Sequence, residues 1–80
     1  MRPKAISVEA LEDYILIIEF DNGEKKLFDV KPYLDKKAFL QLKDNNNFKK
    51  VKVSGLSIEW EIGVDICPDE LYNNSYSIDN

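Results

Sequence analysis

The chain has 80 residues, of which 44% are hydrophobic and 32% are charged, values typical of one ordinary globular domain. This composition excludes a disordered chain, a collagen and a disulfide-rich scaffold. The longest apolar run, Tyr14 to Ile18, is far shorter than the roughly 20 residues of a membrane-spanning helix. No apolar signal segment follows the basic start, so we expect a cytoplasmic domain over residues 1–76 with a frayed tail, 77–80.

The inventory of reactive side chains argues against an enzyme. The sequence has no histidine and a single cysteine, Cys67, so the commonest general base, the commonest metal ligand and an intramolecular disulfide are all missing. Without a base, Cys67 is interpreted as a half-buried apolar residue rather than a nucleophile. Glu59, Glu61 and Asp65 are interpreted as a solvated polar face rather than a cation site. We predict no catalytic activity, no cofactor and no metal.

Charge is unevenly distributed along the chain. The net charge is −4, but residues 31–52 hold seven lysines and two acids, whereas residues 53–80 hold six acids and no Lys or Arg. Net acidity disfavours a general phosphate-binding surface. A local lysine patch leaves a nucleic-acid-associated regulatory module as an alternative function, with Lys49, Lys50 and Lys52 as its candidate contacts.

The N-terminal half predicts three strands. Residues 4–11 alternate weakly and predict an edge strand, which a polar turn connects to a hairpin. Asn-Gly between two apolar runs is typical of a two-residue type I′ turn, so Asn22-Gly23 is expected to place Ile17 opposite Phe28. That register gives two apolar faces: one with Ile15, Ile17, Phe28 and Val30, the other with Leu16, Ile18, Phe20 and Leu27. Either a helical segment of the chain covers the second face or another molecule does.

The remaining elements are short. Pro32 is suited to a first helical position, so a helical turn is expected at 32–34, with Asp29 accepting backbone hydrogen bonds beside it. One or two short helical pieces follow, and then strands at 51–53, 58–62 and 64–66. Pro68 opens a last helix. The whole pattern predicts an α+β domain with about five or six short antiparallel strands, helical turns in the middle and a C-terminal helix.

Three stretches in chain order carry a family resemblance. They are Phe20-Asp21-Asn22-Gly23 with Phe28-Asp29-Val30-Lys31-Pro32-Tyr33-Leu34; Phe48 with Val51 and Val53; and Ile58-Glu59-Trp60, Gly63, Asp65-Ile66, and Pro68 with Leu71-Tyr72. In these stretches the chain resembles the small bacterial domain of unknown function 2442. The resemblance implies a compact α+β domain on antiparallel sheet, with gene neighbourhoods similar to toxin–antitoxin pairs, and it implies no catalytic residues. Some members carry an added helix-turn-helix, for which this chain leaves no room.

The favoured functional hypothesis is a protein-interaction or regulatory module. Trp60 is in phase with neighbouring apolar residues and is therefore predicted to lie in the core. The expected partner is another protein or a second copy of the chain, with no membrane involved. The candidate interface residues are Ile15, Ile17, Phe28, Ile62, Tyr72 and Tyr76.

Overall fold

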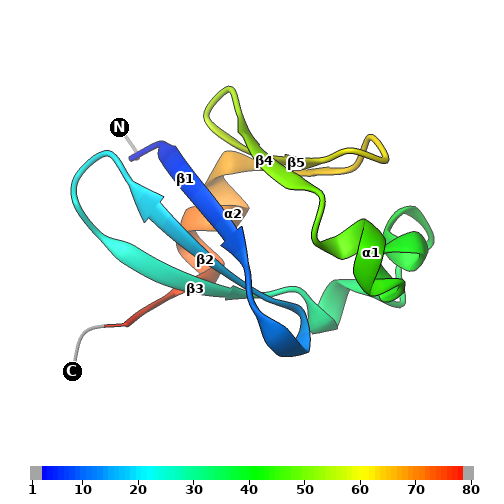
Figure 1. Cartoon of the computed structure of the whole chain (residues 1–80). Helices are drawn as coiled ribbons and strands as arrows, with labels where there is room; N and C mark the ends of the chain where they lie inside the picture. The colour runs from blue at the N-terminus through cyan, green and yellow to red at the C-terminus, as the bar shows by residue number, and fades with distance from the viewer. Residues whose placement is uncertain (1–2, 79–80) are drawn as a thin grey trace.

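The computed structural model describes residues 3–78, which form two antiparallel sheets and a few short helices (Figure 1). Sheet A has the strand order β1 (Ala5–Ala10), β2 (Ile15–Phe20), β3 (Lys25–Asp29) and β7 (Tyr76–Ser77). Sheet B consists of β4 (Val51–Ser54), β5 (Ser57–Trp60) and β6 (Asp65–Ile66). The predicted α+β class is confirmed, with two strands of only two residues each.

Two of the hairpin turns are built in the same way. Phe20 and Glu24 close a three-residue loop that ends in Gly23, and Trp60 and Val64 close a second one that ends in Gly63. These glycines have φ angles of 91° and 100°, where a residue with a Cβ is strained. A three-residue loop with a glycine in its last position is a common alternative to the two-residue turn.

The first of these loops corrects the predicted hairpin register. Leu16 lies opposite Phe28, and Ile17 lies opposite Leu27, one residue away from the expected pairing. Because successive side chains in a strand point to opposite faces, this slip exchanges Leu27 and Phe28 between the faces of the sheet. The two-residue turn predicted from Asn22-Gly23 is therefore wrong.

The core lies between the two sheets. Sheet A contributes the buried face of β2, namely Leu16, Ile18 and Phe20, and sheet B contributes Ile58 and Trp60. Trp60 is 0% exposed, and its Nε1 donates a hydrogen bond to the carbonyl oxygen of Phe48 at 3.0 Å. The prediction that Trp60 is a core residue is confirmed.

Short helical pieces connect the two sheets, as the sequence predicts. The 3₁₀ helices η2 (Lys31–Tyr33) and η3 (Lys37–Lys43) precede α1 (Asn45–Phe48). Asp44 caps α1 because its side chain accepts a hydrogen bond from the backbone N–H of Asn46 at 2.9 Å. A further 3₁₀ turn, η1 (Glu12–Tyr14), joins β1 to β2.

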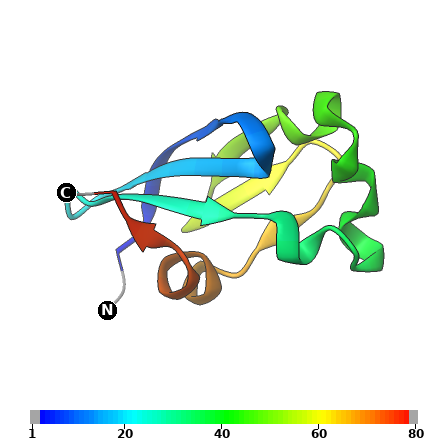
Figure 2. The same cartoon turned by 90° about the horizontal axis from the view of Figure 1, so that it is seen from below.

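The C-terminal part adds a helix and a strand to the fold. Helix α2 (Pro68–Asn74) begins at proline, as expected, and its buried residue is Leu71. After α2 the chain returns to sheet A, where Leu27 lies opposite Tyr76 in β7. Ser77, the first residue of the expected frayed tail, belongs to β7; residues 79–80 of that tail lie outside the described residues. Figure 2 shows β7 beside α2 and next to β3.

Candidate interaction face

The outer face of sheet A, turned away from sheet B, carries an apolar stripe. One row crosses all four strands: Glu9, Ile17, Leu27 and Tyr76 lie directly side by side. Residues opposite each other in paired strands share a face, so these four side chains project to the same side. The apolar members of this face, called the outer stripe below, are Leu11, Ile15, Ile17, Leu27, Tyr76 and Ile78.

The outer stripe is accessible. Tyr76 is 51% exposed, Leu11 39% and Ile78 38%, while Ile15, Ile17 and Leu27 are half-buried and are not part of the core cluster. In Figure 2, β2 and β3 lie in front of sheet B, and no helix of the described chain crosses the face turned to the viewer. An apolar patch rimmed by polar groups marks an interaction site more often than scattered apolar residues do.

Charged side chains border the central row on both sides, and on one side Asp29 of β3 lies opposite Ile15. Glu19 of β2 lies opposite Lys25 of β3, one row away from the central row. Over β1 and β2 the surface forms a hollow of about 190 Å³, whose lining includes Glu9, Ile17 and Glu19 and extends to Lys25 of β3. The face thus combines an exposed aromatic residue at the β7 side with a carboxylate-lined hollow at the β1 side.

Three of the predicted interface residues meet on this face. Ile15 and Ile17 come from β2, and Tyr76 reaches the same face from β7. The sequence reasoning missed Leu27, because the two-residue turn assigned it to the other side. A sequence pattern that could have placed Leu27 correctly is the glycine three residues after Phe20 and again three residues after Trp60. This spacing fits a three-residue loop in both hairpins.

The other three predicted interface residues lie elsewhere. Phe28 is 1% exposed and belongs to the core, because the corrected register turns it inward. Ile62 sits in the second three-residue loop and packs, half-buried, against the core cluster. Tyr72 also packs against that cluster, from α2.

Tyr72 fastens α2 to the first hairpin. Its ring contacts Phe20 edge-on with ring centroids 5.1 Å apart, and Lys26 Nζ lies 3.8 Å from its ring centroid. Its hydroxyl donates a hydrogen bond to Glu24 Oε1 at 2.6 Å, and Asn22 Nδ2 donates to the same oxygen at 2.7 Å. These two hydrogen bonds hold the pKa of the Glu24 carboxyl below its ordinary value, and the bond to Glu24 raises the pKa of Tyr72.

The lysines named as candidate nucleic-acid contacts have carboxylates beside them. Lys50 Nζ lies 3.7 Å from Glu61 Oε1, and Lys52 lies opposite Glu59 in the β4–β5 pair. Lys49 is exposed and lines a separate hollow together with Glu12. Neighbouring carboxylates of this kind oppose the binding of phosphates, whose charge is negative.

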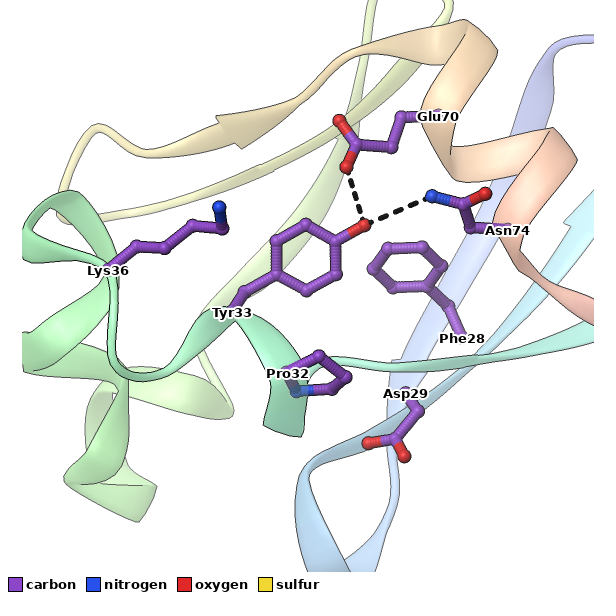
Figure 3. A pocket seen from close by; sticks show the side chains of 7 residues that line it. All are labelled: Phe28, Asp29, Pro32, Tyr33, Lys36, Glu70 and Asn74. Carbon is purple, nitrogen blue, oxygen red and sulfur yellow. Dashed lines mark hydrogen bonds between the residues drawn. The ribbon is translucent and has the colours of Figure 1, made fainter.

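A second feature is an open groove of about 550 Å³ between η2 and α2 (Figure 3). Tyr33 stands at its centre; its hydroxyl donates to Glu70 Oε2 at 2.6 Å and accepts from Asn74 Nδ2 at 3.3 Å. Burial and, secondly, the bond to Glu70 raise the pKa of Tyr33 above its ordinary value. The hydrogen bonds of Tyr33 with Glu70 and Asn74 attach α2 to η2.

Asp29, at the rim of the same groove, has the structural role expected of it. Its Oδ1 accepts the backbone N–H of Lys31 at 2.9 Å and lies 3.1 Å from Lys31 Nζ. The hydrogen bond to Asp29 is the main reason that the pKa of Lys31 is raised. These contacts hold the start of η2 against the end of β3.

Cys67 is exposed, so the prediction of a half-buried thiol is wrong. It precedes Pro68 at the start of α2 and is not part of the core cluster. Among residues 3–78, no three His, Cys, Asp or Glu side chains come together in a way that could hold a metal ion. Within that part of the chain, no helix has the length and the apolar character needed to cross a membrane.

A comparison with known protein families confirms the family resemblance that the ordered motifs carry. The family model described as "Protein of unknown function (DUF2442)" matches residues 5–77, which is nearly the whole chain. The chain belongs to this family. The match includes every strand found in residues 3–78 and also α2, so every residue of the outer stripe except Ile78 falls within it. No curated protein and no solved structure matches the chain.

Proposed function

We propose that this DUF2442 domain is a non-enzymatic protein-interaction module whose contact surface is the outer stripe. The observation that carries the proposal is the unbroken apolar row of Ile17, Leu27 and Tyr76 across three strands of sheet A. Burying apolar surface contributes roughly 25 cal/mol per Å², so covering this row with a partner is favourable. An exposed tyrosine is also a frequent anchor residue in protein interfaces.

The edges of sheet A favour contact through the face rather than addition of a strand. The outermost strand on one side, β7, has two residues and offers little backbone to pair with. On the other side, β1 lies beside sheet B, and the N–H of Ala5 donates to the carbonyl oxygen of Leu56 at 3.4 Å. The partner is therefore expected to meet side chains and not backbone groups.

The outer face of sheet B provides the contrast. Its centre is formed by Lys52 opposite Glu59 and by Glu59 opposite Asp65, so it is polar and charged. Nothing in this arrangement favours burial, because removing charged groups from water is costly. The outer face of sheet A is thus apolar and that of sheet B is charged. Sheet B therefore supplies a control surface within the same molecule.

Photo-crosslinking in the cells that produce the protein tests the proposal. A benzophenone amino acid is placed at Ile17 or at Tyr76, and in a control chain at Lys52 on the outer face of sheet B. We expect a discrete protein adduct from the two stripe positions and none of that mass from position 52. If the captured partner is the product of a neighbouring gene, the result would also support a toxin–antitoxin-like regulatory role. Adducts that are absent, or the same at all three positions, would contradict an interaction module built on this face.

A further inference from the structure

We propose that the outer stripe binds a second copy of this chain, face to face, about a two-fold axis that runs parallel to the strands. This inference rests on the proposed function and names its partner. It comes from the order of residues across sheet A, where the central row reads Glu9, Ile17, Leu27, Tyr76 from one edge to the other. Stacked antiparallel sheets commonly pack with their strands nearly aligned, about 10 Å apart.

A two-fold axis along the strands, passing between β2 and β3, reverses the strand order of the facing protomer. It lays β2 of one protomer over β3 of its partner, so Ile17 faces the partner's Leu27. It also lays β1 over β7, so Glu9 faces the partner's Tyr76. The apolar centre is then covered by apolar side chains, and each carboxylate at the rim meets a phenol that can donate a hydrogen bond to it.

Of the two rows beside the central one, the row of Glu19 and Lys25 is complementary in charge under the same operation, while the other row brings Ile15 over the partner's Asp29. Glu19 lies in β2 and Lys25 lies opposite it in β3, so the reversal places Glu19 over the partner's Lys25. The symmetry generates this ion pair twice. A two-fold axis perpendicular to the strands would instead lay each strand over the same strand of the partner. If that axis ran along the central row, it would bring Glu9 onto the partner's Glu9. Charge complementarity therefore selects the axis parallel to the strands.

The shape of the face is also complementary under this operation. Tyr76, 51% exposed, projects from the β7 side of the face, and the hollow of about 190 Å³ lies towards the β1 side, lined by Glu9 and Ile17 of the central row and by Glu19 and Lys25 of the next row. Reversing the strand order puts the Tyr76 of each protomer over the hollow of the other. A projecting aromatic residue on one side of the face and a hollow towards the other side favour a self-complementary interface.

Charge reversal tests this geometry with the purified, full chain. Self-association is measured by sedimentation equilibrium for the wild type, Glu19→Lys and Lys25→Glu. Each single variant turns both intermolecular ion pairs into repulsive pairs, so we expect about a tenfold weaker dimer. An equimolar mixture of the two variants restores both attractive pairs, and so does the double variant; both are expected to dimerise as the wild type does.

The matched control uses sheet B. Lys52 and Glu59 form a cross-strand pair on its outer face, like Glu19 and Lys25 on sheet A. Lys52→Glu and Glu59→Lys therefore cause the same intramolecular charge reversal, and they are expected to leave self-association unchanged. Thermal unfolding of every variant shows whether it is folded, and the double variant keeps the cross-strand pair within the chain.

Each outcome decides the inference. A wild type that stays monomeric up to its solubility limit overturns it, and a mixture that does not restore association overturns the two-fold geometry. Restoration by mixing, with no effect from the sheet B variants, supports it. If the purified chain is monomeric but the crosslinker at position 76 still captures a different protein in cells, the proposed function stands and only the binding of a second copy is refuted. A monomer with no crosslink from the outer stripe refutes both.

Discussion

The hydroxyl of Tyr72 in α2 donates a hydrogen bond to Glu24 Oε1 across a sequence separation of 48 residues, at 2.6 Å. Glu24 follows the loop of the first hairpin, so this single contact joins the C-terminal helix to the N-terminal sheet. The same tyrosine lies under Lys26 and against Phe20. By fixing α2 here, Tyr72 also fixes the point from which the chain enters β7 and delivers Tyr76 to the outer stripe.

The Tyr72–Glu24 bond has a consequence for acid stability. The Tyr72 hydroxyl, followed by the Asn22 amide, lowers the pKa of Glu24 from its ordinary 4.5. A carboxyl with a lowered folded pKa contributes stability that is complete above 4.5 and is lost as the pH falls through the folded pKa. We expect Tyr72→Phe to raise the pKa of Glu24 towards 4.5, measured by NMR titration of its carboxyl carbon. Tyr76→Phe is the control, and an unchanged pKa in Tyr72→Phe would contradict the bond.

The Tyr33–Glu70 bond predicts an effect at alkaline pH. Burial and, secondly, the bond to Glu70 raise the pKa of Tyr33 above 10.0, so its contribution to stability is complete below 10.0 and is lost as the pH rises through the folded pKa. In Glu70→Gln the pKa of Tyr33 is expected to fall but to stay above 10.0, because burial, the larger cause, is unchanged. NMR titration of the tyrosine ring carbons measures this shift. A Tyr33 pKa that does not respond to Glu70→Gln would show that the hydrogen bond has no such effect.

The glycines of the two three-residue loops are expected to be sensitive to alanine. At Gly23 and Gly63 an added Cβ would meet no atom within 4 Å, so the cost of alanine is due to the backbone alone. With φ of 91° and 100°, this cost is about 1–2 kcal/mol of unfolding free energy at each site. Asparagine tolerates positive φ better and should cost less than alanine. Urea unfolding measures both, and alanine variants as stable as the wild type would rule out the left-handed conformation.

Trp60 is expected to be the most costly residue to truncate. It is 0% exposed and packs against Phe39 and Phe48, so Trp60→Ala should lower the unfolding free energy by about 3–5 kcal/mol. That loss is a large part of the total stability of a small domain, so Trp60→Phe provides a milder second variant. Leu56→Ala, at a position 51% exposed, should change stability by less than about 0.5 kcal/mol. Equal losses at the two positions in urea unfolding would contradict the assignment of Trp60 to the core.

Much of the fold follows from local sequence patterns. The alternation of apolar residues in β2 and around Trp60 predicts strands with one buried side, because the side chains of a strand point alternately to two faces. Pro68 predicts the start of α2, because its missing N–H and fixed φ suit a first helical position. These signals act within a few residues and need no knowledge of the rest of the chain.

The candidate site was only half predictable. Ile15, Ile17 and Tyr76 were identified, but Leu27 and Phe28 were exchanged because one residue more in the loop reverses the faces of the following strand. Tyr72 was predicted to be an interface residue, whereas it packs against Phe20 and the hairpin. In each case the sequence predicted the element correctly but assigned the side chain to the wrong face or the wrong neighbour.

The sequence by itself determined the class of fold, the approximate positions of its strands and helices, and the family to which the chain belongs. The tertiary structure alone decided that Tyr76 pairs with Leu27, and so that the outer stripe spans three strands. The physical reason is that a two-residue strand such as β7 has no periodicity to detect. It forms because α2 is held in place and presents the following residues to the open edge of β3.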